Sequence, residues 1–271
     1  MSVKKVLIFD SGVGGLSVFE QVIKQSPALQ YFYLFDNAYF PYGELDADFI
    51  VRRLKHLLGA FVETYKIDLI VIACNTASTI ALPFLREHFS IPIVGVVPAI
   101  KPAALLTENG IIGLLATPAT IDRPYTAQLI KEFAADKQVL KMGSTQLVKL
   151  AECKLHGKLI RPEDIEAVLA PWLSLEKVPD TIVLGCTHFP LLKEEIARCF
   201  QGKINLVDSG NAIAQRIAQL LAQTPDMKRE NIHQAFFTQD FSEQQSDEFK
   251  ALQRSFSAFG FSSLQLYCLD D

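Results

Sequence analysis

The feature that most limits the folds open to this chain is a series of short apolar runs that lack polar alternation. A strand with one solvated face alternates apolar and polar residues, whereas a strand covered on both faces of a parallel sheet is apolar throughout. Amphipathic segments separate the runs, so we expect an α/β fold with doubly wound, mainly parallel sheets. The expected strands are residues 3–9, 30–35, 69–73, 93–96, 110–115, 138–142, 181–184 and 204–207.

Two segments between these runs have clear helical patterns. In RPEDIEAVLAPWL, Pro162 lies near the first turn and acidic residues follow it, where the positive end of a helix favours them. A second helix is expected at 46–65, because its apolar residues fall on one face: Phe49, Ile50, Leu54, Leu57, Leu58, Phe61 and Val62.

Length and composition narrow the class of protein. The 271 residues suffice for about two domains. The net charge of −4 and the lack of a basic stretch argue against nucleic-acid binding. The apolar run 6–9 is too short for a signal peptide, and no run approaches the roughly 18–20 apolar residues of a membrane span. We therefore expect a cytoplasmic protein that does not bind membranes.

The five cysteines have no CxxC pair, which makes a disulfide framework or a structural zinc site unexpected. Two of them occupy similar positions. LIVIACNTAS and TIVLGCTHFP each contain an apolar strand that ends at a cysteine, Cys74 or Cys186, followed by polar residues and a helical pattern. This internal echo predicts two similar α/β lobes that each offer a thiol from the end of a strand, where open α/β sheets bind ligands.

A third strand end carries polar groups in the segment VLIFDSGVGGLSV. Asp10 and Ser11 close the strand, and the glycines after them allow a tight turn. A dinucleotide fingerprint would require glycine where Ser17 stands, and no GK[ST] follows as in a P-loop. The polar groups of this turn therefore join the two cysteines as candidates for a site.

Two opposed thiols suit inversion of a stereocentre. At a helix N-terminus the pKa of a thiol falls below its free value of about 8.5. One thiolate could then remove a proton from a carbon acid while the other thiol protonates the opposite face, without a cofactor. Asp10 would assist one thiol, and Glu152 and His188 the other. Backbone N–H groups and the hydroxyls of Ser11, Thr76 and Thr187 could hold carboxylates.

Three alternatives remain from the residues alone. A thiol hydrolase would leave the second cysteine idle. A zinc site formed by Cys74, Cys186 and His188 would lack the usual ligand spacing. A non-catalytic, two-lobed protein that binds an amino acid would explain the polar strand ends but not the paired thiols.

Four motifs together resemble the glutamate racemases, which are cofactor-independent enzymes that make D-glutamate for peptidoglycan. They are DSGVGGLS, FPYG at 40–43, ACNTAS and GCTHFPLL, in the order and approximate spacing of that family. The resemblance implies two lobes with the active site in the cleft between them. The second lobe, 98–208, would be inserted into a first lobe made of 1–97 and 209–271.

The resemblance also assigns roles by position. Cys74 would act on D-glutamate and Cys186 on L-glutamate, with Asp10, Glu152 and His188 assisting proton transfer. The substrate contacts implied are Asp10, Ser11, Pro41, Tyr42, Gly43, Asn75, Thr76, Thr117, Thr120, Thr187 and His188. No cofactor and no metal are implied. Aspartate and hydantoin racemases also carry two cysteines, so the choice of glutamate depends on the motifs.

Further expectations concern partners and the remaining reactive side chains. The segment GVVPAIKPAA resembles a subset of the family that a peptidoglycan nucleotide precursor activates, although little chain precedes the first strand here. The expected partners are glutamate, such a precursor and a second copy of the chain. We expect no function for Cys153, Cys199 and Cys268, and solvated side chains for His56, His88, His156 and His233.

Overall fold

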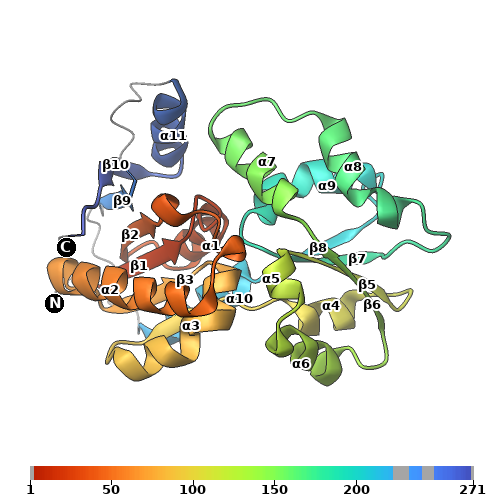
Figure 1. Ribbon diagram of the computed structural model, residues 1–271, viewed down its shortest axis with the longest axis horizontal. Coiled ribbons are helices and arrows are strands. Elements are labelled where there is room, and N and C mark those ends of the chain that lie inside the picture. Colours follow the sequence, from red (N-terminus) through yellow and green to blue (C-terminus); the bar gives the residue numbers. More distant parts are fainter. Residues whose placement is uncertain (1–2, 222–231, 240–246, 270–271) are drawn as a thin grey trace.

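Two parallel sheets, each between layers of helices, form the protein (Figure 1). The computed structural model describes residues 3–221, 232–239 and 247–269. The six-stranded sheet has the order β10-β9-β2-β1-β3-β4, with β1 Lys5–Asp10, β2 Gln30–Phe35, β3 Leu69–Ile72, β4 Ile93–Gly95, β9 His233–Phe237 and β10 Phe261–Leu266. The four-stranded sheet has the order β6-β5-β7-β8, with β5 Ile111–Ala116, β6 Gln138–Gly143, β7 Thr181–Gly185 and β8 Asn205–Val207.

Every strand pair in both sheets is parallel, which confirms the predicted α/β fold class. We call the six-stranded sheet with its helices the first lobe, and the four-stranded sheet with its helices the second lobe. The two sheets share one strand order, because β2-β1-β3-β4 in the first corresponds to β6-β5-β7-β8 in the second. Cys74 follows β3 and Cys186 follows β7, so the two thiols occupy equivalent places.

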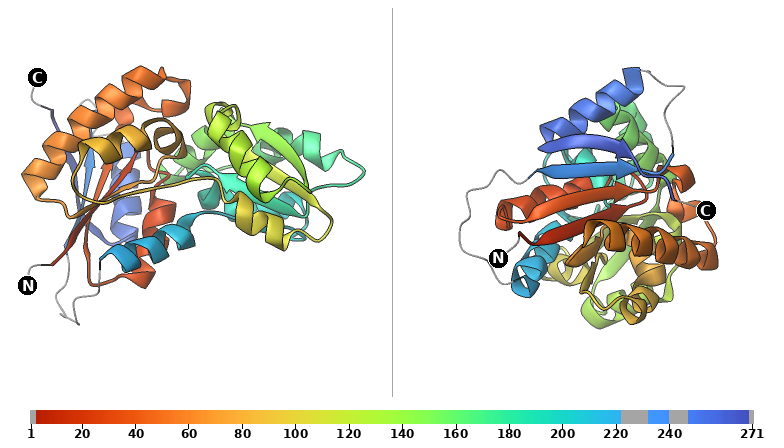
Figure 2. Two further views of the ribbon diagram at one scale, coloured as in Figure 1. Left: turned by 90° about the horizontal axis from the view of Figure 1, so that it is seen from below. Right: turned by 90° about the vertical axis from the view of Figure 1, so that its left-hand side faces the viewer.

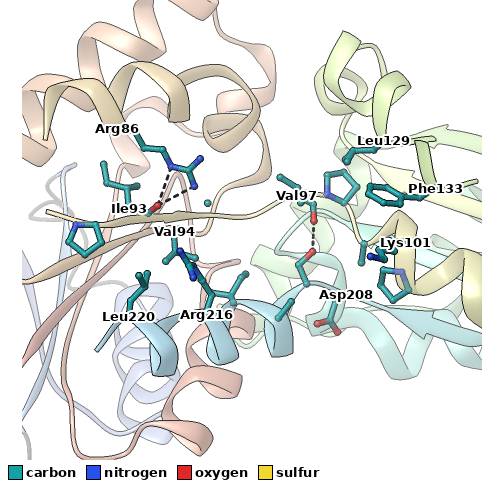
Figure 3. Close-up of a pocket in the computed structure, with 18 of the residues that line it drawn as sticks. Arg86, Ile93, Val94, Val97, Lys101, Leu129, Phe133, Asp208, Arg216 and Leu220 are labelled. Carbon is teal, nitrogen blue, oxygen red and sulfur yellow. Dashed lines mark hydrogen bonds between the residues drawn. The ribbon is translucent and has the colours of Figure 1, made fainter. Parts of the chain in front are cut away.

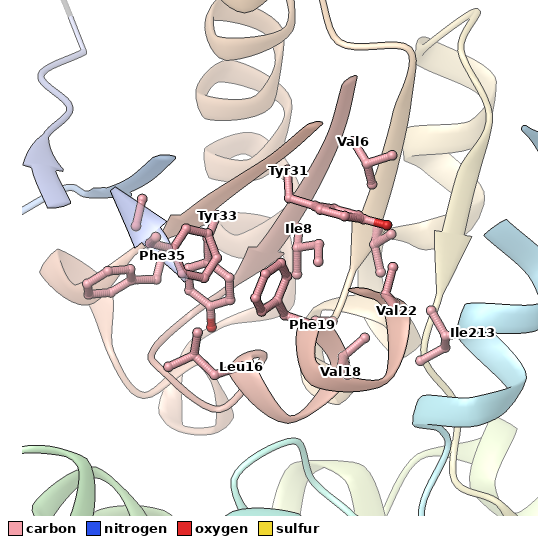
Figure 4. Packing of buried hydrophobic residues seen from close by; sticks show 14 of the residues in the cluster. Val6, Ile8, Leu16, Val18, Phe19, Val22, Tyr31, Tyr33, Phe35 and Ile213 are labelled. Carbon is pink, nitrogen blue, oxygen red and sulfur yellow. The ribbon is translucent and has the colours of Figure 1, made fainter. Parts of the chain in front are cut away.

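The helices of the first lobe cover both faces of its sheet. Helices α1 (Leu16–Gln25), α10 (Gly210–Leu220) and α11 (Asp247–Ala258) pack on one face, and α2 (Ala47–Tyr65) and α3 (Asn75–His88) on the other. In the first of these layers the ring of Phe19 contacts the ring of Tyr31 (Figure 4). It also contacts the ring of Phe261. Each such buried aromatic side chain stabilises the fold by about 1.5–3 kcal/mol.

The second lobe repeats this layering on a smaller scale. Helices α7 (Thr145–Leu155), α8 (Pro162–Leu173) and α9 (Lys193–Cys199) cover one face of the sheet, and α4 (Ile100–Leu106) and α6 (Pro124–Phe133) the other. The short α5 (Pro118–Ile121) follows β5 at the side facing the first lobe (Figure 1).

The two helices predicted from their patterns are α2 and α8. Asp46 caps α2 by accepting hydrogen bonds from the N–H groups of Asp48 and Phe49. The buried face of α2 consists of predicted residues: Ile50, Leu54, Leu57, Leu58 and Phe61. Helix α8 begins at Pro162, with two acidic residues in its first turn. Amphipathic spacing and capping residues were therefore sufficient to locate both helices.

The chain passes between the lobes through residues 96–99, after β4, and 208–209, after β8 (Figure 2). A hydrogen bond from Ser209 Oγ to the Val97 carbonyl joins these two crossing segments. The predicted division into 1–97 with 209–271 and 98–208 stays a proposal. In the described part of the chain, no helix is both long and apolar enough to cross a membrane.

Two features of the first lobe differ from the sequence predictions. Strands β9 and β10 were not predicted, and they extend the sheet beyond β2. His233, expected to be solvated, is buried at the start of β9, where its Nδ1 accepts a hydrogen bond from the Tyr31 N–H. Burial lowers the pKa of His233, which favours the neutral ring that can accept this bond.

Candidate active site

A small cavity lies between the carboxyl ends of the two sheets. Its volume is about 20 Å³, which is room for about one water molecule. Both lobes contribute to its wall, which consists of Asp10, Ser11, Phe40, Pro41, Tyr42, Gly43, Cys74, Asn75, Thr76, Thr117, Val148, Cys186, Thr187 and His188.

The structure thus brings most of the predicted site residues together, and two of them lie behind the wall. Glu152 contacts His188, and Thr120 accepts a hydrogen bond from the Thr117 hydroxyl at 3.0 Å. Two wall residues, Phe40 and Val148, were not among the predicted site residues. Phe40 belongs to the FPYG motif, whereas Val148 is one of several apolar residues on the buried face of α7 and carries no signal of its own.

Cys74 lies at the start of helix α3 and caps it. Its Sγ accepts a hydrogen bond from the Ala77 N–H at 3.5 Å and lies 3.6 Å from Ser11 Oγ. Only 6% of the residue is exposed. The thiol therefore depends on these few protein groups, and not on bulk water, for its hydrogen bonds and its protonation.

The predicted lowering of the Cys74 pKa is wrong in this structure. Burial, and next the charge of Asp10, raise the pKa of Cys74 to about 12, although the hydrogen bonds from Ala77 and Ser11 oppose this. The positive end of a helix does favour a thiolate, but desolvation and a nearby carboxylate outweigh it here. At neutral pH the Cys74 side chain is accordingly a thiol that can donate a proton.

Cys186 has different neighbours, although it follows the equivalent strand. It does not start an α-helix, as the sequence suggested, but precedes a single 3₁₀ turn, Phe189–Leu192. Its Sγ lies 3.7 Å from His188 Nδ1, and His188 Nε2 lies 2.7 Å from Glu152 Oε1. The burial of His188 would lower its pKa, but its contacts with Cys186 and Glu152 raise the pKa well above its ordinary value. This thiol thus has an imidazole–carboxylate pair beside it.

Asp10 is fully buried at the end of β1 and contacts both lobes. Its Oδ1 accepts a hydrogen bond from the Ser11 N–H at 2.6 Å, and its Oδ2 accepts one from Thr187 Oγ1 at 2.8 Å. Burial raises the pKa of Asp10 above its ordinary value, against the charge of His188 and these hydrogen bonds. A carboxyl group with a raised pKa next to Cys74 is suited to exchange protons with that thiol.

The glycine-rich turn after β1 brings the first lobe against the second. A Cβ atom added to Gly12 would lie 2.4 Å from Glu152 Oε1, and one added to Gly14 would lie 2.5 Å from His188 Nδ1. Neither position has room for any side chain. These glycines are therefore needed for the close approach of the backbone to the groups around Cys186.

Hydrogen bonds join the lobes around the cavity. The Val13 N–H donates to Glu152 Oε1 at 2.9 Å, and Ser17 Oγ donates to the Thr187 carbonyl at 2.8 Å. On the other side of the cavity, the hydroxyls of Thr76 and Thr117 are 3.3 Å apart. These contacts between the lobes accompany the small volume of the cavity, which has room for about one water molecule.

The loop that carries FPYG is held by a buried ion pair. Tyr42 Oη donates a hydrogen bond to Asp36 Oδ2 at 2.7 Å, and Arg53 binds both oxygens of Asp36 at 2.9 Å. Thr238, after β9, donates to Asp36 Oδ1 at 2.6 Å. The Tyr42 hydroxyl thus takes part in holding the loop.

A second, larger cavity lies beside the segments that cross between the lobes (Figure 3). Its volume is about 830 Å³. Three cationic side chains contribute to its wall, namely Arg86, Lys101 and Arg216, together with the single acidic residue Asp208. Most of the remaining lining is apolar. The cavity thus has the size and charge for an anionic ligand with an apolar part.

Comparisons with known proteins agree with this geometry. A family model described as Asp/Glu/Hydantoin racemase matches residues 7–217. The chain is 54% identical over 232 residues to the glutamate racemase of Klebsiella pneumoniae (strain 342), covering 85% of this chain and 82% of that protein.

The crystal structure of Escherichia coli glutamate racemase, in complex with L-glutamate and the activator UDP-MurNAc-Ala, superimposes with a TM-score of 0.92. It is 47% identical and covers 100% of both chains. An aspartate racemase homologue from Pyrococcus horikoshii shares only the fold, with 18% identity and a TM-score of 0.51 over 82% of this chain and 100% of that one.

Proposed function

Since the chain belongs to the Asp/Glu/Hydantoin racemase family, we propose that it interconverts L- and D-glutamate without a cofactor. The observation that carries this proposal is the pair of buried thiols, Cys74 and Cys186, which follow equivalent strands and line one cavity from two lobes. The 54% and 47% identities to glutamate racemases support glutamate as the substrate.

In the direction from L- to D-glutamate, the Cys186 thiolate removes the Cα proton and becomes a thiol. The Cys74 thiol gives its own proton to the opposite face of Cα and becomes a thiolate. In the reverse direction Cys74 acts as the base and Cys186 as the acid. His188 supports the thiolate of Cys186 through its Nδ1, and Asp10 exchanges a proton with Cys74.

Substrate binding would use the polar groups of the cavity wall. Ser11, Asn75, Thr76 and Thr187 present hydroxyl or amide groups there, and Thr117 faces Thr76 from the second lobe. The start of α3 also presents free N–H groups, which favour a carboxylate. We propose that Pro41, Tyr42 and Gly43 contact the substrate through their backbone, and that Thr120 acts by orienting Thr117.

The product, D-glutamate, would serve peptidoglycan synthesis, as the family resemblance implies. Two thiols must stay reduced for this mechanism, and the five cysteines are free in the structure. A reducing compartment maintains that state, so a cytoplasmic location is part of the proposal. A homodimer is also proposed, and its test is the mass of the protein in solution by sedimentation.

We further propose that a nucleotide precursor of peptidoglycan activates the enzyme by binding the cavity at the crossing segments. The E. coli structure contains such an activator, UDP-MurNAc-Ala. Arg86, Lys101 and Arg216 supply positive charge for phosphates. Residues 97 and 209, joined by a hydrogen bond, belong to both the cavity wall and the crossing segments, so a ligand there would affect how the lobes move.

The experiment that tests the proposed function is circular dichroism of each glutamate enantiomer incubated with the protein, with and without UDP-MurNAc-Ala. We expect the signal of either enantiomer to decay to zero, and the precursor to accelerate the decay. The aspartate enantiomers would be incubated in the same way. Decay of their signal, with no decay for glutamate, would identify aspartate as the substrate. Binding of glutamate without any change in its signal would indicate a non-catalytic binding protein instead.

A further inference from the structure

Glu152 lies between the small cavity that Cys74 and Cys186 line and a third cavity behind it. This cavity has a volume of about 200 Å³ and is lined by Gly12, Phe35, Asn37, Phe40, Glu152, His156, Gln239 and Leu252. Such a volume has room for several water molecules. The carboxylate of Glu152 contacts His188 through one oxygen and faces His156 through the other.

Four titratable groups form a continuous series through this region. Cys186 Sγ is 3.7 Å from His188 Nδ1, and His188 Nε2 is 2.7 Å from Glu152 Oε1. Glu152 Oε2 is 3.9 Å from His156 Nε2. The last distance is too long for a direct hydrogen bond, but it suits a single bridging water.

Exposure is low at the two inner groups of the series and higher at the two outer groups. The exposed fraction is 7% for Cys186, and that of the side chain is 3% for His188, 15% for Glu152 and 22% for His156. The thiol end is therefore shielded from solvent, whereas the imidazole of His156 reaches it. Since His156 lies one helical turn after Glu152, at the end of α7, the two side chains share one face of that helix.

We propose that His156 is the outer member of a proton relay that connects Cys186 to solvent through His188 and Glu152. This inference rests on the proposed function, because it concerns how the enzyme recovers between turnovers. Each conversion of L- to D-glutamate leaves Cys186 as a thiol and Cys74 as a thiolate. The next turnover in the same direction requires Cys186 to lose that proton.

The outward transfer moves one proton and changes no bond between heavy atoms. His188 enters this step as the neutral ring with its proton on Nε2; the Cys186 proton passes to Nδ1, and the Nε2 proton passes to Glu152 Oε1. A half-turn of the imidazole then returns the remaining proton to the Nε2 position, so that Nδ1 can accept again in the next turnover. Rotation of the carboxyl group about its Cγ–Cδ bond presents this proton to His156 Nε2, directly or through water. His156 releases a proton to solvent from its other nitrogen. In the opposite direction the same steps return a proton to the Cys186 thiolate.

The test separates this recovery step from catalysis on the substrate. Recovery of the free enzyme limits turnover at saturating substrate but is absent from kcat/KM, and it makes inhibition by the product enantiomer noncompetitive. For His156→Asn in dilute buffer, we expect kcat to fall several-fold, kcat/KM to stay near the wild-type value, and added imidazole buffer to restore kcat. The matched control is His56→Asn, which changes an exposed histidine of α2 in the first lobe.

Two results would overturn the relay. One is a His156→Asn protein with wild-type kcat and competitive product inhibition in dilute buffer. The other is an equal fall in kcat and kcat/KM that imidazole does not restore, which would indicate a structural role. If His156→Asn does not fold, His156→Gln provides the same readouts. An inactive wild-type protein would instead contradict the proposed function, so the two failures are distinguishable.

Discussion

The two lobes have the same strand order but provide their thiols with different neighbours. In the first lobe, Cys74 caps a long helix and lies near Asp10 from the adjacent strand β1. In the second lobe, the strand equivalent to β1 is β5, and its last residue, which takes the place of Asp10, is Ala116, which is not ionisable. Cys186 instead has His188 from its own loop and Glu152 from α7.

This difference indicates that the repeated fold fixes where the thiols lie but not how they are protonated. Burial and the charge of Asp10 keep Cys74 in its thiol form. Cys186 instead lies 3.7 Å from the imidazole of His188, which is hydrogen-bonded to Glu152. The two thiols therefore have different groups with which to exchange protons, which suits the proposed two-base mechanism.

The largest expected effect is the loss of either thiol. Cys74→Ser and Cys186→Ser should each lower kcat for both enantiomers by roughly 10³-fold or more, because a hydroxyl is far less acidic than a thiol. The measurement is the rate of racemisation by circular dichroism. Cys268→Ser changes an exposed thiol and should leave the rate unchanged. A wild-type rate in either active-site variant would refute the paired role.

The next effect concerns the contact between the lobes. A Cβ atom at position 14 would lie 2.5 Å from His188 Nδ1 and 2.6 Å from Thr187 Oγ1, so Gly14→Ala should displace the groups around Cys186. We expect kcat to fall by about 100-fold, as for other displacements of about 1 Å. Gly59→Ala, in α2 where nothing lies within 4 Å, is the control. It should keep full activity and raise the free energy of unfolding by about 0.5–1 kcal/mol.

A third change tests the ion pair between Arg53 and Asp36, which holds the FPYG loop of the first lobe. Arg53→Met would remove the cation that binds both oxygens of the fully buried Asp36. The free energy of unfolding by urea should fall by about 2–3 kcal/mol, since hydrogen bonds to a buried charge are lost. Lys24→Met is the control, because it removes only an exposed ion pair with Glu20. It should change the free energy of unfolding by less than about 0.5 kcal/mol. Equal effects of the two changes would contradict the supporting role of Arg53.

The smallest effect is on the reactivity of Cys74. The charge of Asp10 raises the pKa of this thiol, so Asp10→Asn should lower that pKa and increase the thiolate fraction at any pH below it. Alkylation of Cys74 by iodoacetamide between pH 7.5 and 9.5 should therefore be faster in the variant, as followed by mass spectrometry. The exposed Cys268 provides the internal reference. Slower alkylation of Cys74 would mean that Asp10 does not oppose its ionisation.

Much of this arrangement could be predicted from the sequence, because it depends on local patterns. The apolar runs located eight strands, and the polar residues after them fell where parallel strands end. Strands β9 and β10 were missed because β9 begins with a histidine and β10 is half-exposed at the sheet edge, so neither is a plain apolar run. Their place is set by the pairing of β9 with β2, which is distant in the sequence, and of β10 with β9.

The chemistry of the site was harder to predict, because it depends on contacts between distant residues. Helix capping by Cys74 is local, but the burial and the Asp10 charge that reverse its pKa shift come from the folded chain. Likewise, His156 was expected to be a solvated side chain. Only the fold places it beside a cavity that also contains Glu152.

The central claim is that each thiol serves one face of the substrate, and its most direct test is early deuterium incorporation in D₂O. Protiated L-glutamate would be incubated with the protein and quenched after a small fraction has reacted. We predict that the D-glutamate formed carries deuterium at Cα, while the remaining L-glutamate keeps its proton. Product that retains the original proton, together with deuterium in the recovered L-glutamate, would indicate a single base and contradict the two-thiol account.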